Sequence, residues 1–317
     1  MSNITKRALI SICLILGAVI LLKQIKLLDW AYLRFSLSQI SGVRISIILL
    51  LVLFINIGSS IRWFLLSKSA GSSLNLESHL EIYFKYGVLN YFVPGGILSE
   101  IMRINVLSNL DNNNDIGNAS GIILDRIMAL ISQIVLLSVV LFLFFKTTIT
   151  ASFLTDPFSV IANILVFLTF MWLLLRILRN IIRQISHYKY GSMMISILKQ
   201  MKKLILQRPL FIFILLAASV ALNIGISFVL FIKISGVTDV GFRDIIIMTT
   251  ASNLSSVIPV TPGGIGISEG IFSFIGSRVD NINPIVTASA YLLVRVSSII
   301  TYATVTMLFR LRKSLRN

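Results

Sequence analysis

Long apolar runs recur along the chain, separated by short stretches that hold most of its polar and charged residues. A helix needs about 20 apolar residues to cross the hydrocarbon core of a bilayer, whereas a barrel strand needs about 10. The pattern therefore predicts an all-α polytopic membrane protein. We expect about six full spans, at 8–22, 45–66, 119–145, 158–175, 210–234 and 285–309.

Two further apolar runs, 82–93 and 245–258, are too short to cross as single helices. Each meets a proline and two adjacent glycines and then resumes in a second short piece. Proline lacks a backbone donor and glycine permits conformations that other residues avoid, so a helix ends there. This pattern is typical of a broken helix that enters a membrane and returns, and we expect re-entrant segments at about 81–109 and about 244–277.

The two broken segments also resemble each other. Both contain Pro-Gly-Gly followed closely by Ser-Glu, and the copies, at Pro94 and Pro262, lie about half the chain apart. In both copies an arginine follows the glutamate at the same interval: Glu100 and Arg126, Glu269 and Arg295. We therefore expect a single membrane domain, 1–317, with one repeat at 45–145 and its second copy at 210–310. The broken-helix motif comprises Pro94, Gly95, Gly96, Pro259, Pro262, Gly263, Gly264, Gly266 and Gly270.

Basic residues predict how the two copies lie in the membrane. Eight basic residues and no acidic residue fall within 176–208, and more basic residues precede the first span and follow the last. Such regions stay on the inner side of a membrane, so we expect a basic cytoplasmic loop at 176–208 and both termini in the cytoplasm. All three regions share one side only if each broken segment enters and returns. The first then enters from the cytoplasm and the second from the outer face, which makes the copies inverted.

The N-terminus resembles a secretory signal, since Lys6 and Arg7 precede the run at 8–22. No small-residue cleavage site follows that run, so we expect a retained first span. One observation opposes this topology, because four basic residues would lie outside the membrane with only Asp29 to balance them: Lys23, Lys26, Arg34 and Arg44.

The composition excludes a soluble enzyme. The chain is 56% hydrophobic and only 13% charged, and its mean hydropathy is +0.93, whereas soluble domains carry about 25% charged residues. The net charge of +16 would suggest nucleic acid as the partner of a soluble chain. In a membrane protein it indicates cytoplasmic loops and contact with anionic headgroups, so we expect no nucleic-acid partner.

Metal and redox chemistry have no basis in the sequence. Cys13 is the single cysteine, and the two histidines, His79 and His187, lie far apart. Glu77, His79 and Glu81 alternate at a spacing that fits no metal site well. We expect neither a metal ion nor a cofactor.

At this point a family resemblance can be stated. The pair Arg62-Trp63, the segment around Pro94 and above all the string from Pro259 to Gly270 are similar to the lysylphosphatidylglycerol synthase transmembrane region family, also called flippase-like domain proteins. The resemblance covers nearly the whole chain. It implies a multi-span bacterial or archaeal membrane domain that moves lipids, sometimes fused to a cytoplasmic aminoacyl-transferase domain. The membrane part accounts for all 317 residues here, so we do not expect the synthase activity.

Arg126 and Arg295 are the leading candidates for binding a substrate. Each lies early in a strongly apolar helix, where an arginine costs a few kcal/mol unless it is paired or faces water. A guanidinium holds a phosphate through two hydrogen bonds, so two related arginines suit a phospholipid or isoprenoid phosphate headgroup. Two alternatives stay open: an internal brace to a glutamate or to Asp125, and snorkelling to the interface.

The remaining candidates lie near these arginines. Ser268 and Glu269 begin the second short helix, where they cap its amino terminus; alternatively Glu269 and Glu100 pair with the arginines or take protons during transport. On the last helix a polar stripe recurs at steps of three and four residues: Thr287, Tyr291, Arg295, Ser298 and Tyr302. We include Ser268, Tyr291 and Tyr302 among the substrate-binding residues.

The sequence thus predicts a lipid flippase or lipid-headgroup transporter of the cytoplasmic membrane, which moves an anionic or modified phospholipid or an isoprenoid-linked lipid between leaflets. Membrane lipids are the expected partners, while a homo-oligomer and a partner lipid- or glycan-modifying enzyme stay open. One alternative is a membrane glycosyl- or phospho-transferase, which would usually need acidic residues on a sizeable outer loop. The other alternative is a non-transporting accessory subunit.

Overall fold

The computed structural model describes residues 41–92, 97–111, 115–148, 191–234, 239–256, 261, 263–279 and 282–315. Two of the predicted spans, 8–22 and 158–175, lie outside these residues. So do five residues of the broken-helix motif: Pro94, Gly95, Gly96, Pro259 and Pro262.

Every regular element in the described part of the chain is helical. Four helices are long and apolar enough to cross a membrane: α3 (Gly42–Ser69), α6 (Asp115–Thr148), α9 (Pro209–Ile234) and α12 (Pro284–Ser314). They correspond to the spans predicted at 45–66, 119–145, 210–234 and 285–309. The predicted helical membrane class is confirmed, with these four candidate spans.

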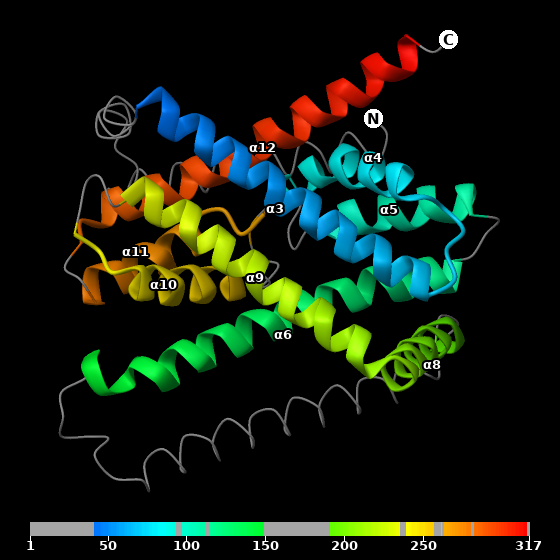
Figure 1. Cartoon of the computed structure of the whole chain (residues 1–317), viewed down its shortest axis with the longest axis horizontal. Helices are drawn as coiled ribbons and strands as arrows, with labels where there is room; N and C mark the ends of the chain where they lie inside the picture. Colours follow the sequence, from blue (N-terminus) through cyan, green and yellow to red (C-terminus); the bar gives the residue numbers. More distant parts are fainter. Residues whose placement is uncertain are drawn as a thin grey trace, which may run out of the picture.

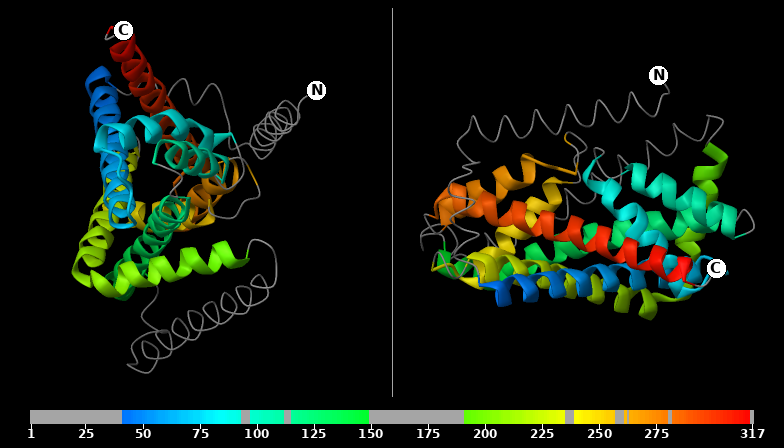
Figure 2. Two further views of the ribbon diagram at one scale, coloured as in Figure 1. Left: turned by 90° about the vertical axis from the view of Figure 1, so that its right-hand side faces the viewer. Right: turned by 90° about the horizontal axis from the view of Figure 1, so that it is seen from above.

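The short helices form two hairpins. The first hairpin consists of α4 (Leu76–Gly87), a single 3₁₀ turn η1 (Val88–Tyr91) and α5 (Ile97–Leu110), and the second consists of α10 (Phe242–Ser255) and α11 (Ile267–Val279). In each hairpin the two helices pack against each other. Figure 2 shows the hairpins at opposite ends of the bundle of long helices.

The helices repeat in the same order. The four helices α3, α4, α5 and α6 are followed by α9, α10, α11 and α12, and the offset between the starts of counterparts is nearly constant, from 42 to 209, 76 to 242, 97 to 267 and 115 to 284. In Figure 1, α3 and α9 run in opposite directions, as do α6 and α12. The two sets therefore have opposite senses within one bundle.

Helix α8 (Gly191–Gln207) occupies part of the basic stretch at 176–208. Its apolar residues Ile197, Met201 and Leu204 are buried in a cluster with side chains of α3, α6 and α9, whereas Lys202 and Lys203 are exposed. This spacing gives an amphipathic helix that lies on the bundle with its lysines outward.

The outer surface of the bundle is apolar. Val43, Leu210 and Phe213 are about two thirds exposed, at 70%, 71% and 66%. Such surface would be costly in water but is suited to lipid. Inside the bundle, large apolar side chains fill the contacts between helices, among them Trp63 and Phe272.

Candidate functional site

A cavity of about 290 Å³ lies between the two hairpins and the long helices α3, α9 and α12. Its apolar wall comes mainly from α3 and α9: Val52, Ile55, Ile226, Val229, Leu230 and Val294. Its polar wall comes from α3, both hairpins and α12: Asn56, Ser59, Tyr83, Tyr91, Asn253, Ser256, Gly263, Tyr291, Arg295 and Ser298. The cavity therefore lies about midway along the long helices and joins the two copies of the repeat.

The turn of the second hairpin explains its glycines. Gly263, Gly264 and Gly266 have φ values of 58°, 71° and 89°, in the left-handed region that other residues rarely adopt. A Cβ atom on Gly263 would lie 3.0 Å from the Cα of Tyr91 and 3.1 Å from the carbonyl oxygen of Asn90. The turn of the second hairpin thus rests directly on the end of η1 in the first.

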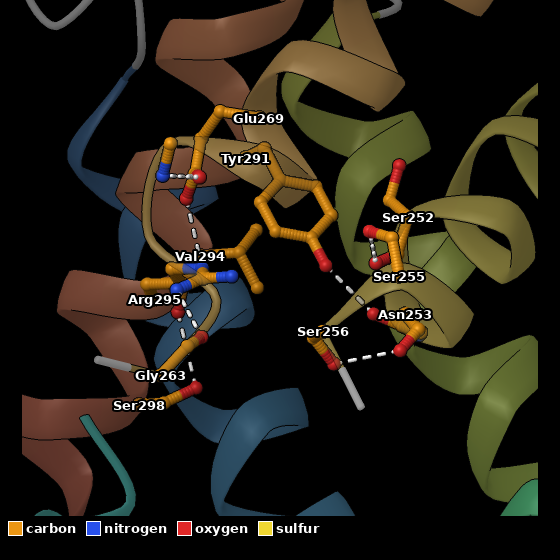
Figure 3. A network of polar contacts seen from close by, with 11 residues as sticks. Ser252, Asn253, Ser255, Ser256, Gly263, Glu269, Tyr291, Val294, Arg295 and Ser298 are labelled. Atoms are coloured by element: carbon orange, nitrogen blue, oxygen red, sulfur yellow. Dashed lines mark hydrogen bonds and ion pairs between the residues drawn. The ribbon is translucent and has the colours of Figure 1, made fainter. Parts of the chain in front are cut away.

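Glu269 and Arg295 hold this turn against α12 (Figure 3). The Nε atom of Arg295 lies 2.9 Å from Oε1 of Glu269, and its Nη1 donates to the carbonyl oxygen of Gly263 at 2.7 Å. The other carboxylate oxygen, Oε2, accepts the backbone N–H of Gly266 at 2.7 Å. Glu269 therefore both caps the start of α11 and pairs with Arg295, so the two roles that the sequence left open occur together.

The first copy has the same pairing. Arg126 on α6 donates to Glu100 on α5, across the same sequence interval that separates Glu269 from Arg295. The side chains of Arg126 and Glu100 are 41% and 20% exposed, whereas those of Arg295 and Glu269 are 10% and 0% exposed. The first pair is thus partly exposed, whereas the second is buried.

Asp125, the other acid considered for Arg126, pairs elsewhere. Its Oδ1 lies 2.6 Å from Nε of Arg62, whose Nη1 donates to Oγ of Ser219 at 2.9 Å. Arg62 therefore joins α3, α6 and α9, and the brace of Arg126 is its glutamate. The sequence had also suggested Asp125 as that brace, whereas the structure pairs Asp125 with Arg62 of α3.

Tyr291 and Tyr302 lie on α12 and donate to asparagines. Tyr291 lines the cavity, and its hydroxyl donates to Oδ1 of Asn253 at 2.7 Å. The hydroxyl of Tyr302 donates to Oδ1 of Asn56 at 2.8 Å, and its ring packs on that of Tyr83 with centroids 6.0 Å apart. Tyr302 does not line the cavity itself but packs against Tyr83 and bonds to Asn56, which do.

Ser268 and Gly270 complete the second copy of the motif. Ser268 is fully buried, and its hydroxyl has no hydrogen-bond partner within the described residues. A Cβ atom on Gly270 would meet nothing within 4 Å. The structure thus brings Ser268, Glu269, Tyr291 and Arg295 together at one turn, while Glu100 and Arg126 meet separately in the first copy.

The sequence did not single out the asparagines within the apolar helices. Asn56 on α3 and Asn223 on α9 occupy equivalent places, because each lies the same distance from the start of its helix. Asn56 accepts from Tyr302 of α12, and Asn223 accepts from Gln133 of α6 at 3.2 Å. Each asparagine thus links the first long helix of one copy to the last long helix of the other. A buried amide in an apolar helix was the available signal.

Two titratable groups lie at the open end of the first hairpin, away from its turn. His79 on α4 is fully buried beside Trp63 and Phe64, and burial lowers its pKa below the ordinary value of 6.5. For Asp111, burial alone would raise the pKa, but hydrogen bonds from Ser73 outweigh that effect and lower it. No group of three His, Cys, Asp or Glu side chains that would suit a metal ion occurs among the described residues.

The comparison with known families agrees with this architecture. The family described as lysylphosphatidylglycerol synthase TM region matches residues 8–306. The chain belongs to this family. As a member of the lysylphosphatidylglycerol synthase TM region family it is a multi-pass membrane protein of lipid-related processes. The family is the non-catalytic membrane part of the synthase. No curated protein and no solved structure matches the chain.

Proposed function

We propose that this chain moves a lipid between the leaflets of the cytoplasmic membrane, with the headgroup passing through the central cavity. The observation that carries the proposal is the meeting of two hairpins of opposite sense at a polar cavity midway along the long helices. Two similar halves of opposite sense are the architecture of many transporters, because they can expose one central site to either side in turn.

The distribution of basic residues supports an orientation. Helix α8 and the carboxyl-terminal end of α12 lie toward the same end of the bundle in Figure 1. At that end Arg312 pairs with Glu77 at 2.6 Å and Lys313 with Glu81 at 2.8 Å, so α4 of the first hairpin begins there too. We place this end in the cytoplasm. The first hairpin then enters from the cytoplasm and the second from the outer face, and each is re-entrant.

We propose that each Glu–Arg pair holds its hairpin in the packed position. Separating a buried pair leaves a charge without compensation, so the Arg295–Glu269 pair favours the packed position of the second turn. Arg126 and Glu100, being more exposed, hold the first hairpin less firmly. In transport a headgroup would approach as one pair loosens, and Ser268 and Tyr291 would then contact it.

The test is lipid movement in reconstituted vesicles. Purified protein is placed in liposomes with a small fraction of labelled phosphatidylglycerol, phosphatidylcholine, a short-chain isoprenyl phosphate or a glucosyl diacylglycerol, and loss of label from the outer leaflet is timed. We expect at least one of these lipids to cross faster with the protein and the Arg126→Ala/Arg295→Ala variant to lose that acceleration. The absence of any accelerated lipid, with and without a proton gradient, would overturn the proposal.

A further inference from the structure

The cavity wall offers both hydrogen-bond acceptors and hydrogen-bond donors. Ser256 donates its hydroxyl proton to the carbonyl oxygen of Asn253 at 2.6 Å, and Ser298 donates to that of Val294 at 3.1 Å. Tyr291 must donate to Oδ1 of Asn253, since that oxygen only accepts. Figure 3 shows these contacts. The three hydroxyl oxygens therefore keep lone pairs for a ligand, while the hydroxyls of Tyr83 and Tyr91 and Nδ2 of Asn253 add donors to the same wall.

Two of the donors in the wall, Arg295 and Asn56, already have partners. Arg295 directs Nε to Glu269 and Nη1 to the carbonyl oxygen of Gly263. Asn56 uses its Nδ2 on the carbonyl oxygen of Val52 at 2.9 Å. A wall that holds uncharged donors and acceptors together suits a ligand whose groups both donate and accept, such as hydroxyl groups. A fully ionised phosphate only accepts, and an ammonium group only donates, so each would leave part of this wall without a partner.

The charges of the cavity wall distinguish between a hydroxyl-rich ligand and a ligand with an ammonium group. Arg295 is the one charged side chain among the described residues that line the cavity, so no carboxylate in that part of the wall attracts an ammonium group. Its partner Glu269 is fully buried and does not line the cavity. Because the pair is neutral overall, the wall offers little attraction to an anion either. An uncharged ligand with several hydroxyl groups satisfies both conditions.

The shape of the cavity agrees with this chemistry. Its volume of about 290 Å³ equals that of about ten water molecules in the liquid, which leaves room for one sugar ring. The rings of Tyr83, Tyr91 and Tyr291 line it, and an aromatic face packs well on the C–H face of a sugar. We infer that the cavity receives the uncharged, hydroxyl-rich headgroup of a glycolipid. This inference rests on the proposed function, whose substrate class it names.

The experiment compares headgroups on one acyl scaffold. Vesicles containing the full chain receive an acyl-labelled glucosyl diacylglycerol, phosphatidylethanolamine or phosphatidic acid at equal fractions, and crossing rates are measured. We expect the glucosyl lipid to cross about five- to tenfold faster than the other two, since each lost hydrogen bond costs about that much. Faster crossing of phosphatidylethanolamine or phosphatidic acid would overturn the inference while leaving lipid movement itself in place.

Variants at Asn253 sharpen the assignment. Asn253→Leu should remove the preference for the glucosyl lipid, whereas Asn253→Asp, which adds a carboxylate to the wall, should shift it toward phosphatidylethanolamine. The matched controls are Asn105→Leu and Asn105→Asp, because Asn105 is an exposed asparagine on α5 that does not line the cavity. An unchanged ranking in both Asn253 variants would also contradict the inference.

A binding measurement distinguishes this inference from the proposed function. Thermal unfolding of the detergent-solubilised chain is followed with methyl glucoside, glycerol phosphate or ethanolamine, since a ligand that binds only the folded state raises Tm. We expect methyl glucoside alone to raise Tm, and Asn253→Leu to abolish the rise. If methyl glucoside binds but no lipid crosses, the proposed function fails and the headgroup assignment stands. If methyl glucoside has no effect, the headgroup assignment fails.

Discussion

The two hairpins carry the same Glu–Arg pair in different surroundings. Glu269 is fully buried and also accepts the backbone N–H of Gly266, whereas Glu100 is 20% exposed and its arginine 41% exposed. One residue of the motif accounts for part of the difference. Gly266 adopts φ 89° ahead of α11, but the first copy has one residue fewer between Pro-Gly-Gly and Ser-Glu and no such glycine, and its residues there, Ile97 and Leu98, already lie within α5. The same Glu–Arg pair is therefore buried in the second copy and partly exposed in the first.

The largest difference should appear when either pair is broken. Glu269→Ala leaves Arg295 buried without its carboxylate, which typically costs about 3–5 kcal/mol. Glu100→Ala should cost less than Glu269→Ala, because the Arg126–Glu100 pair is less buried than the Arg295–Glu269 pair. Urea unfolding of both variants in the same detergent measures the two losses. Equal losses would mean that the two pairs are held alike, contrary to the exposures.

Replacing glycines of the second hairpin by alanine should give the next largest change in stability. Gly263→Ala combines a positive φ with a contact at 3.0 Å from the backbone of Tyr91, and we expect it to cost about 1–3 kcal/mol. Gly270→Ala is the matched control, since its Cβ atom would meet nothing and alanine favours the helix by up to about 1 kcal/mol. Thermal unfolding compares them, and a neutral Gly263→Ala would show that the turn moves away from Tyr91.

Removing the hydrogen-bond donors to Asn56 and Asn223 should produce a smaller difference in stability between the two copies. Tyr302→Phe leaves Oδ1 of Asn56 without its donor, and Gln133→Leu does the same to Asn223, although Asn223 keeps its bond to Ser132 at 2.8 Å. We expect losses of about 1 kcal/mol for Tyr302→Phe and less for Gln133→Leu. A double variant whose loss equals the sum of the two would show that the contacts are independent.

The smallest effect should be a dependence on pH in the first hairpin alone. Burial lowers the pKa of His79, so its contribution to stability is complete above its ordinary value of 6.5 and is lost as the pH falls below it. Ile245 takes the corresponding fourth position of α10 and does not titrate. The Tm of the natural chain should fall between pH 7.5 and 5 by more than that of His79→Gln. Parallel curves would contradict this prediction.

The sequence predicted the elements better than their contacts. The spans at 45–66 and 210–234 lie within three residues of α3 and within one residue of α9 at each end, because hydropathy in a bilayer specifies helix position strongly. The equal Glu-to-Arg spacing in the two copies correctly marked which glutamate meets which arginine. The partner of Asp125 and the bonds of Asn56 were not predictable in this way, because they join separate long helices and depend on how those helices cross.

These crossing contacts have a consequence for how the chain is made. Asn56 of the first copy bonds to Tyr302 of the second, and Asn223 of the second bonds to Gln133 of the first. In each half the amide oxygen of the buried asparagine takes its hydrogen-bond donor from the other half, so we expect each half to depend on the other for folding. Two separately expressed fragments, cut between Thr148 and Gly191, should therefore assemble into one complex when made in the same cell and be degraded when made alone.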